Sequence, residues 1–247
     1  MLVLALDTAT TAMTAGIVEL DTTPGATSAP TVRAARVGEG GRTHAEHLAP
    51  WIAAVTAEAG ATLPDLDAVV CGVGPGPFTG LRVGMVTASA LGDALGLPVH
   101  GVCTHDALGL AARGRVLAVT DARRREVYWT VSVDGVRTAG PGVARPDDLA
   151  ADLRRPHPGT TFDGTTFDGT GLDGTTLDVV VGDAAGTLGA LTGVPARPPA
   201  GPSAELLAAV AADDLRAGRA PAPLRPLYLR RPDAVPPGAP KTVSRPA

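Results

Sequence analysis

Gly72-Val-Gly-Pro-Gly-Pro-Phe-Thr-Gly-Leu-Arg-Val-Gly84 is the stretch that decides the fold of this chain. It joins an apolar run, Asp67–Val73, to residues 81–95, which have helical periodicity. Glycine allows positive φ and close approach of another backbone, whereas proline restricts φ and removes a hydrogen-bond donor. The alternation predicts a rigid turn from a buried strand into a helix, with Thr79 placed to cap that helix.

A turn of this kind presents backbone N–H groups at a helix N-terminus, where anions are favoured. No Lys follows the glycines, so the stretch is not the phosphate loop G-x-x-x-x-G-K-S/T. Thr79 also stands where the dinucleotide motif G-x-G-x-x-G needs its third glycine. The turn therefore provides only weak candidates for a phosphate site: Gly74, Gly76, Thr79 and Gly80.

A second weak phosphate candidate is the turn Asp7-Thr8-Ala9-Thr10-Thr11, between the predicted strands 2–6 and 14–20. In sugar kinases, actin and heat-shock ATPases a similar hairpin holds the phosphates of ATP, usually with a glycine in the place of Ala9. The candidate ligands here are Asp7, Thr8 and Thr10. The alternative is an ordinary hairpin turn rich in hydroxyl groups.

The rest of the chain predicts a mixed α/β sheet, because three early strands are followed by alternating helices and strands. We expect an N-terminal lobe over residues 1–106 and a C-terminal lobe over 107–232, in which Ser203 caps a helix to Leu215. Four GTTFD-like pentads fill residues 159–178. Their period of five matches neither a strand nor a helix, so an inserted, flexible loop is expected there, with an Asp-rich cation site as the alternative. Residues 233–247 read as a disordered tail.

The composition limits the classes of partner. The 247 residues carry a net charge of −4, so nothing attracts nucleic acid globally, and any contact with RNA would be local or made through a partner. No apolar run approaches the length of a membrane span, and no basic segment precedes the first strand. We expect a cytoplasmic protein with reduced cysteines.

Two helices are candidates for contacting a partner. In the first, residues 43–59, Thr43 and Glu46 form a predicted capping box, and Trp51 lies on the apolar stripe in a chain with few aromatic residues. In the second, residues 81–95, small residues recur every four positions and pack either on the protein's own sheet or against a partner. The interface candidates are His44, His47, Leu48, Trp51, Gly84, Ala88 and Gly92.

Two groups of side chains suggest chemistry only weakly. His44 and His47 would need a third ligand and a base to form a zinc site, and the sequence offers no matching set. Arg123–Arg125 is the only triple basic run, and a solvated turn is favoured over a contact with phosphate or RNA. We predict no catalytic residue and no metal ligand.

Five motifs, taken in order, resemble the TsaB (YeaZ) family: Leu4–Thr8, Arg42–Glu46, Gly74–Gly84, Asp121–Tyr128 and Pro226–Arg230. The pentad repeat departs from the family pattern. The resemblance implies an actin/Hsp70-like ATPase (ASKHA) fold of two ribonuclease-H-like lobes, with the second lobe reduced.

The resemblance also implies a role without catalysis: a scaffold for threonylcarbamoylation of N6 of the adenosine 3′ of the anticodon in tRNA. Its implied partners are a TsaD-like catalytic subunit, which carries a metal-binding H-x-x-x-H absent here, a TsaE-like ATPase, and tRNA mainly through the complex. It implies a homodimer when free and no cofactor of its own, with ATP or ADP at the subunit junction as a candidate. The alternatives are a nucleotide-binding ATPase or kinase-like enzyme using Asp7 and Thr10, and a zinc metallopeptidase using His44 and His47.

Overall fold

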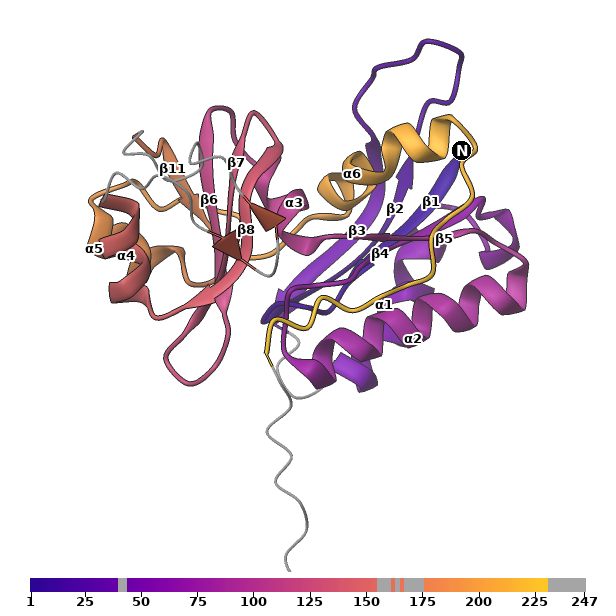
Figure 1. The fold of residues 1–247 in the computed structure, drawn as a ribbon. Helices are drawn as coiled ribbons and strands as arrows, with labels where there is room; N and C mark the ends of the chain where they lie inside the picture. The colour runs from indigo at the N-terminus through magenta and orange to yellow at the C-terminus, as the bar shows by residue number, and fades with distance from the viewer. Residues whose placement is uncertain (40–43, 155–160, 163–164, 167–175, 231–247) are drawn as a thin grey trace, which may run out of the picture.

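The computed structural model describes residues 1–39, 44–154, 161–162, 165–166 and 176–230, and nothing is said of the remainder. Its main features are two mixed sheets, each covered by helices and standing side by side (Figure 1). The predicted α/β fold with two lobes is confirmed.

The first sheet has five strands in the order β3-β2-β1-β4-β5. The strands are β1 (Leu2–Asp7), β2 (Ala12–Glu19), β3 (Thr31–Glu39), β4 (Ala68–Gly72) and β5 (Val99–Val102). β1, β2 and β3 pair antiparallel, whereas β4 and β5 continue the sheet parallel to β1. This arrangement is that of a ribonuclease-H-like lobe.

Both faces of this sheet are buried because successive side chains of β1 point to opposite faces and are all apolar up to Asp7. One face, with Leu4 and Leu6, packs against α1 (His44–Glu58) and α2 (Phe78–Leu95). The other face, with Val3 and Ala5, packs against α6 (Ala204–Arg216). Figure 1 shows α6 on the opposite side of the sheet from α1 and α2, and a short 3-10 helix, η2 (Leu63–Asp65), precedes β4.

The second sheet repeats the order of the first without a fifth strand: β8-β7-β6 pair antiparallel, and β11 runs parallel to β6. Its reduced size is therefore confirmed. The strands are β6 (Arg115–Asp121), β7 (Val127–Val133), β8 (Val136–Ala144) and β11 (Val179–Val181), with β9 (Thr161–Phe162) and β10 (Thr165–Thr166) paired separately. The helices are α3 (Thr104–Gly109), α4 (Pro146–Arg154) and α5 (Ala185–Thr192).

One of the three expected helix caps needs correction. α2 begins at Phe78, with Pro77 at the N-cap and no side-chain cap, so Thr79 lies inside the first turn and does not cap the helix. The predicted cap of α6 is confirmed, because Ser203 Oγ accepts a hydrogen bond of 3.2 Å from the backbone N–H of Leu206. The capping residue predicted for α1, Thr43, lies outside the described residues.

The chain returns to the first lobe after building the second. α6 contacts β1 and β2, and the C-terminal strap, which we define as residues 221–230, packs Leu224 and Leu227 against the first core. The prediction that residues 107–232 belong to the second lobe is therefore wrong for α6 and the strap. The physical reason is that the open apolar face of the first sheet needs a cover, which α6 supplies. Residues 233–247 and most of the pentad repeat lie outside the described residues.

Candidate functional site

Asp7 ends β1 at the junction of three segments and is fully buried. Its Oδ1 accepts a hydrogen bond of 2.8 Å from the backbone N–H of Ala9, and its Oδ2 accepts one of 2.6 Å from Thr104 Oγ1. Thr104 Oγ1 in turn accepts a bond of 3.2 Å from the N–H of Gly74. Burial raises the pKa of the Asp7 carboxyl to about 6, although these hydrogen bonds oppose the shift. Asp7 thus joins the first turn to α3 and to the glycine-proline turn.

The hydroxyls of Thr8 and Thr10 are also engaged within the chain. Thr8 Oγ1 donates a bond of 2.7 Å to the carbonyl of Gly80 and accepts one of 2.9 Å from the N–H of Gly84. Thr10 Oγ1 donates a bond of 2.7 Å to the carbonyl of Ala12. These threonines bond the first hairpin, which is the turn between β1 and β2, to the start of α2 and to β2.

The glycine-proline turn packs directly on that hairpin. A Cβ on Gly76 would lie 2.2 Å from the carbonyl oxygen of Ala9, and one on Gly72 would lie 1.6 Å from Asp7 Oδ2. Gly74 has φ of +95°. The structure therefore brings Asp7 and Thr8 together with Gly74, Gly76 and Gly80, but as a close-packed junction, while Thr79 is exposed at the start of α2.

Asp183 connects the two lobes where their first hairpins face each other. Its Oδ2 accepts bonds of 2.7 Å from Thr11 Oγ1 and 3.3 Å from the N–H of Thr11, and its Oδ1 accepts one of 2.8 Å from the N–H of Asp121. The carboxylate therefore stands between the two turns and would repel an anion there.

The α1 side chains predicted to contact a partner differ in their exposure to solvent. Leu48 is in the core, and Trp51 is half-buried with its ring against the backbone of Gly38, 3.1 Å from the position of a Cβ there. His47 is exposed, and the side chain of His44 lies outside what the structure describes. Of the α1 candidates whose side chains the structure describes, His47 and part of Trp51 are accessible.

The small-residue strip of α2 faces inward. Gly84, Ala88 and Gly92 are buried, and a Cβ on Gly84 or Gly92 would lie 2.6 Å from Thr8 Oγ1 or 2.3 Å from Val99 Cγ2. Of the two roles open to the strip, packing on the protein's own sheet is the one found. The exposed face of α2 carries different residues and, with the strap, borders an open groove of about 580 Å³: Arg82, Met85, Val86, Ser89, Ala90, Asp93, Leu224, Pro226 and Tyr228.

Four similarities to known proteins bear on the family. A family model described as TsaD, tRNA N6-adenosine threonylcarbamoyltransferase, matches residues 38–152. An uncharacterized protein of Mycobacterium tuberculosis is 48% identical over 235 residues, which cover 95% of this chain and 94% of the relative. The tRNA threonylcarbamoyladenosine biosynthesis protein TsaB of Escherichia coli is 38% identical over 93 residues, which cover 36% of this chain and 40% of the relative. The structure of YeaZ from Pseudomonas aeruginosa superposes with a TM-score of 0.65 at 24% identity, over 92% of this chain and 99% of that one. The chain is TsaB/YeaZ-like.

In this TsaB/YeaZ-like chain, four of the five quoted motifs converge in space, and the other, Arg42–Glu46, lies partly outside the described residues. The first hairpin and the glycine-proline turn share the junction around Asp7, and the hairpin between β6 and β7 faces it across Asp183. The strap reaches the same region, because the N–H of Leu227 donates a bond of 2.9 Å to the carbonyl of Val73.

Sequence reasoning missed three features of this region of the fold. Thr104 and Asp183 gave no signal, since single polar residues after a strand are common. Phe78, Arg82 and Tyr228 lie in two quoted motifs, yet their contact joins residues 146 positions apart and becomes visible only in the fold.

The described residues contain neither a candidate metal site nor a candidate membrane span. Among those residues, no group of three His, Cys, Asp or Glu side chains could hold a metal ion. A search of the same residues finds no helix long and apolar enough to cross a membrane.

Proposed function

We propose that this chain is a non-catalytic subunit of the machinery that attaches threonylcarbamoyl to N6 of the adenosine 3′ of the anticodon in tRNA. It acts in the cytoplasm by binding a TsaD-type catalytic subunit and helping to recruit a TsaE-type ATPase, and tRNA reaches it mainly through the complex. The observation that carries the proposal is the similarity of the chain to TsaB in sequence and to YeaZ in fold.

The state of the phosphate-type turns supports a role without chemistry of its own. The polar atoms of Asp7, Thr8 and Thr10 are satisfied inside the chain, and Gly76 packs against the backbone of Ala9. Asp183 adds negative charge between the two hairpins. We place any ATP or ADP at the junction with the partner subunit, where the partner would supply the phosphate ligands.

The accessible side of α1 and α2 is the surface we assign to the partner. It carries His47 on α1, and Val86, Ser89 and Ala90 on α2, where Val86 is 66% exposed. An exposed valine between small residues lets a partner helix approach closely and bury apolar area. The same surface would join two copies of this chain when the partner is absent.

Reconstitution tests the proposal. The purified chain is mixed with the TsaD-type and TsaE-type proteins, and modification of an unmodified tRNA transcript is measured with and without the chain. We expect a stable complex with the TsaD-type protein and modification only when the chain is present. Full modification without the chain, or ATP turnover by the chain alone, would contradict the proposal, and the second result would favour the kinase-like alternative.

A further inference from the structure

An aromatic platform lies on the surface where the strap crosses the start of α2. The rings of Phe78 and Tyr228 stack with their centroids 5.1 Å apart, and the guanidinium carbon of Arg82 lies 3.8 Å from the centroid of Phe78. Arg82 Nε donates a bond of 2.7 Å to the hydroxyl of Tyr228. Phe78 is 44% exposed and Tyr228 37% exposed, in a chain with only 3% aromatic residues. Two of its few aromatic rings therefore form a stack that is partly exposed to solvent.

Two residues beyond Tyr228, the strap contacts a basic hairpin of the second lobe. Arg230 forms an ion pair with Glu126 and donates a bond of 3.5 Å to the carbonyl of Arg123, in the hairpin between β6 and β7. Two residues of extended backbone span at most about 7 Å, so the platform and the hairpin lie close together. The strap thus makes one continuous surface from parts of both lobes.

The hairpin holds three consecutive arginines in a costly conformation. Arg123, Arg124 and Arg125 have φ of +62°, +54° and +61°, a region that few residues other than glycine, asparagine and aspartate adopt. All three side chains are exposed. Hydrogen bonds hold the loop at its ends, from the N–H of Ala122 to the carbonyl of Glu126 and from the N–H of Glu126 to the carbonyl of Arg123. Strain of this kind persists where the side chains it presents have a use.

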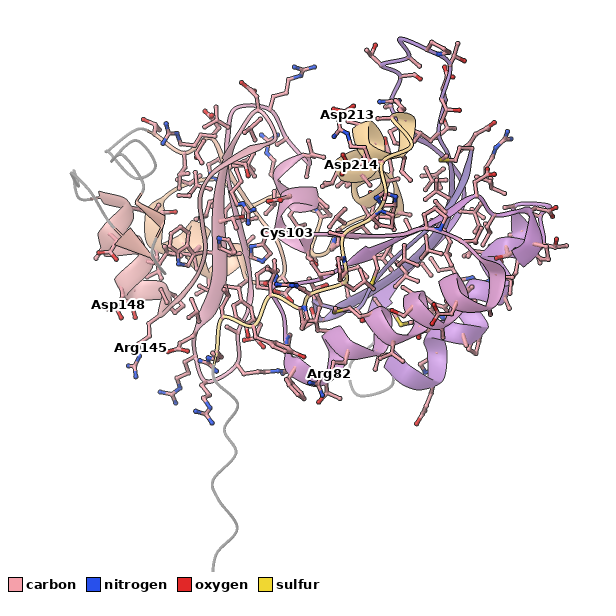
Figure 2. All side chains as sticks on the ribbon, turned by 45° about the vertical axis from the view of Figure 1, so that its right-hand side comes forward. Arg82, Cys103, Arg145, Asp148, Asp213 and Asp214 are labelled. Carbon is pink, nitrogen blue, oxygen red and sulfur yellow. The ribbon has the colours of Figure 1, made fainter. Side chains whose placement is uncertain are left out.

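The charge at this end of the molecule is positive, although the whole chain is negative. Arg145 follows β8 directly beyond Ala144, which pairs with Val127 next to the hairpin. Figure 2 shows Arg145 and Arg82 at the same lower end of the molecule, one from each lobe. Asp121 and Glu126 pair with Arg123 and Arg230. The other acidic side chains nearby are Asp147 and Asp148 in the first turn of α4, and Asp183, whose Oδ1 accepts a hydrogen bond from the N–H of Asp121 on the side of the hairpin that faces the first lobe.

We propose that this surface binds single-stranded RNA: the arginines of the hairpin contact backbone phosphates, and an unpaired base stacks on the platform of Phe78, Arg82 and Tyr228. Arginine suits phosphate through its paired N–H donors, and exposed rings and guanidinium planes are the usual stacking partners of unpaired bases. The inference rests on the proposed function, because tRNA carries its unpaired bases in loops. The platform adjoins the exposed face of α2 around Val86, because Arg82, Val86 and Tyr228 line the same groove, so the test below also measures complex formation.

The test uses the assembled complex with the TsaD-type subunit and an unmodified anticodon stem-loop RNA, with a blunt duplex of the same length for comparison. For the variant Arg124→Glu/Arg125→Glu we expect an RNA affinity about tenfold lower at moderate salt, with the slope of log affinity against log salt reduced by about two. Arg113→Glu/Arg197→Glu, with the same change of charge on exposed residues elsewhere in the second lobe, should leave both quantities unchanged.

The platform is tested separately. Tyr228→Leu should lower affinity for the stem-loop by about tenfold with the salt slope unchanged, while Tyr228→Phe retains the ring and the affinity. Binding of the duplex should not respond to Tyr228→Leu.

Each result decides between the inferences. Normal complex formation with unchanged RNA affinity in these variants, or an equal loss in the control, would overturn the RNA surface and leave the proposed function standing. Loss of the complex in either variant would show instead that the surface binds protein. If the wild-type chain forms no complex, the proposed function fails. The same RNA measurements on the chain alone then test the RNA-binding surface, which is rejected if the variants bind RNA as tightly as the wild type.

Discussion

At the scale of single residues, the junction around Asp7 shows how one sequence pattern supports two different uses. The carboxylate, hydroxyls and glycines that suggest a phosphate site are all present, and the fold brings them together. What separates this junction from a phosphate cradle is the distance between backbones. Gly76 lies against Ala9, so the space for a phosphate is occupied by the chain itself.

Replacing Asp7 by Asn should change how stability depends on pH. The pKa of Asp7 is raised from 3.8 to about 6 in the folded state, so folding favours the protonated form. Its contribution is therefore lost as pH rises from about 4 to about 6, by roughly 3 kcal/mol. We expect Asp7→Asn to gain stability relative to wild type between pH 4.5 and 7.5 in urea unfolding experiments.

The comparison isolates Asp7 because other titrating groups are common to both proteins. His105 is the largest of these, since burial lowers its pKa to about 3 and it destabilises the fold as pH falls below its unfolded value. A pH-independent difference between Asp7→Asn and wild type would contradict the assignment of Asp7 as a buried, raised carboxyl.

Gly76→Ala should destabilise the protein strongly. Its Cβ would lie 2.2 Å from the carbonyl oxygen of Ala9, a backbone atom that cannot move without shifting the hairpin. Overpacking of this kind costs about 1–3 kcal/mol, to be measured by denaturant unfolding. Gly186→Ala is the matched control, because nothing lies within 4 Å of its Cβ inside α5, and helix propensity predicts a gain of up to about 1 kcal/mol. Equal stability of the two variants would refute the close contact.

At the scale of elements, α2 has two faces with different roles. Its inner face uses glycine and alanine so that the helix lies close to β4 and the first hairpin. Its outer face presents Val86 and small residues beside the strap. The periodicity of the sequence identified the small strip, and the fold assigned it to the interior.

Val86→Arg should weaken binding of the TsaD-type subunit at least about tenfold, because a charge would be buried at the centre of the proposed interface. Isothermal titration calorimetry measures the loss, and circular dichroism checks that the fold is retained. Val136→Arg is the matched control, since Val136 is 69% exposed on β8 in the second lobe. Equal affinity of Val86→Arg and Val136→Arg would remove the outer face of α2 from the interface.

At the scale of the whole molecule, the two lobes are joined by contacts between segments far apart in the sequence. Asp183 bonds to Thr11 and Asp121, and the strap runs from the first core to the hairpin between β6 and β7. Figure 1 shows how α6 and the strap bring the C-terminal part of the chain back to the first lobe.

Asp183→Ala should loosen this connection without unfolding either lobe. We expect faster hydrogen exchange at the N–H groups of Thr11 and Asp121, which lose their acceptor, and a loss of about 1–2 kcal/mol in unfolding free energy. Asp178→Ala removes a carboxylate bond to the N–H of Arg115 within the second lobe and should leave exchange at Thr11 unchanged. Unaltered exchange at both Thr11 and Asp121 in Asp183→Ala would argue against the bridge.

The sequence by itself determined the elements and the family. Alternating apolar runs, the glycine-proline turn and the Ser203 cap are local features, so they predict the strands, α2 and α6 from neighbouring residues alone. Only the tertiary structure decided which face of each element is free. It therefore decided that Gly84 and Asp7 pack inside the protein and that Tyr228 lies on the surface. That outcome depends on which distant segment covers each surface: α6 on the first sheet, the hairpin on the glycine turn, and the strap on α2. Contacts between residues so far apart leave no periodic signal in the sequence, because periodicity reports only on neighbouring positions within one element.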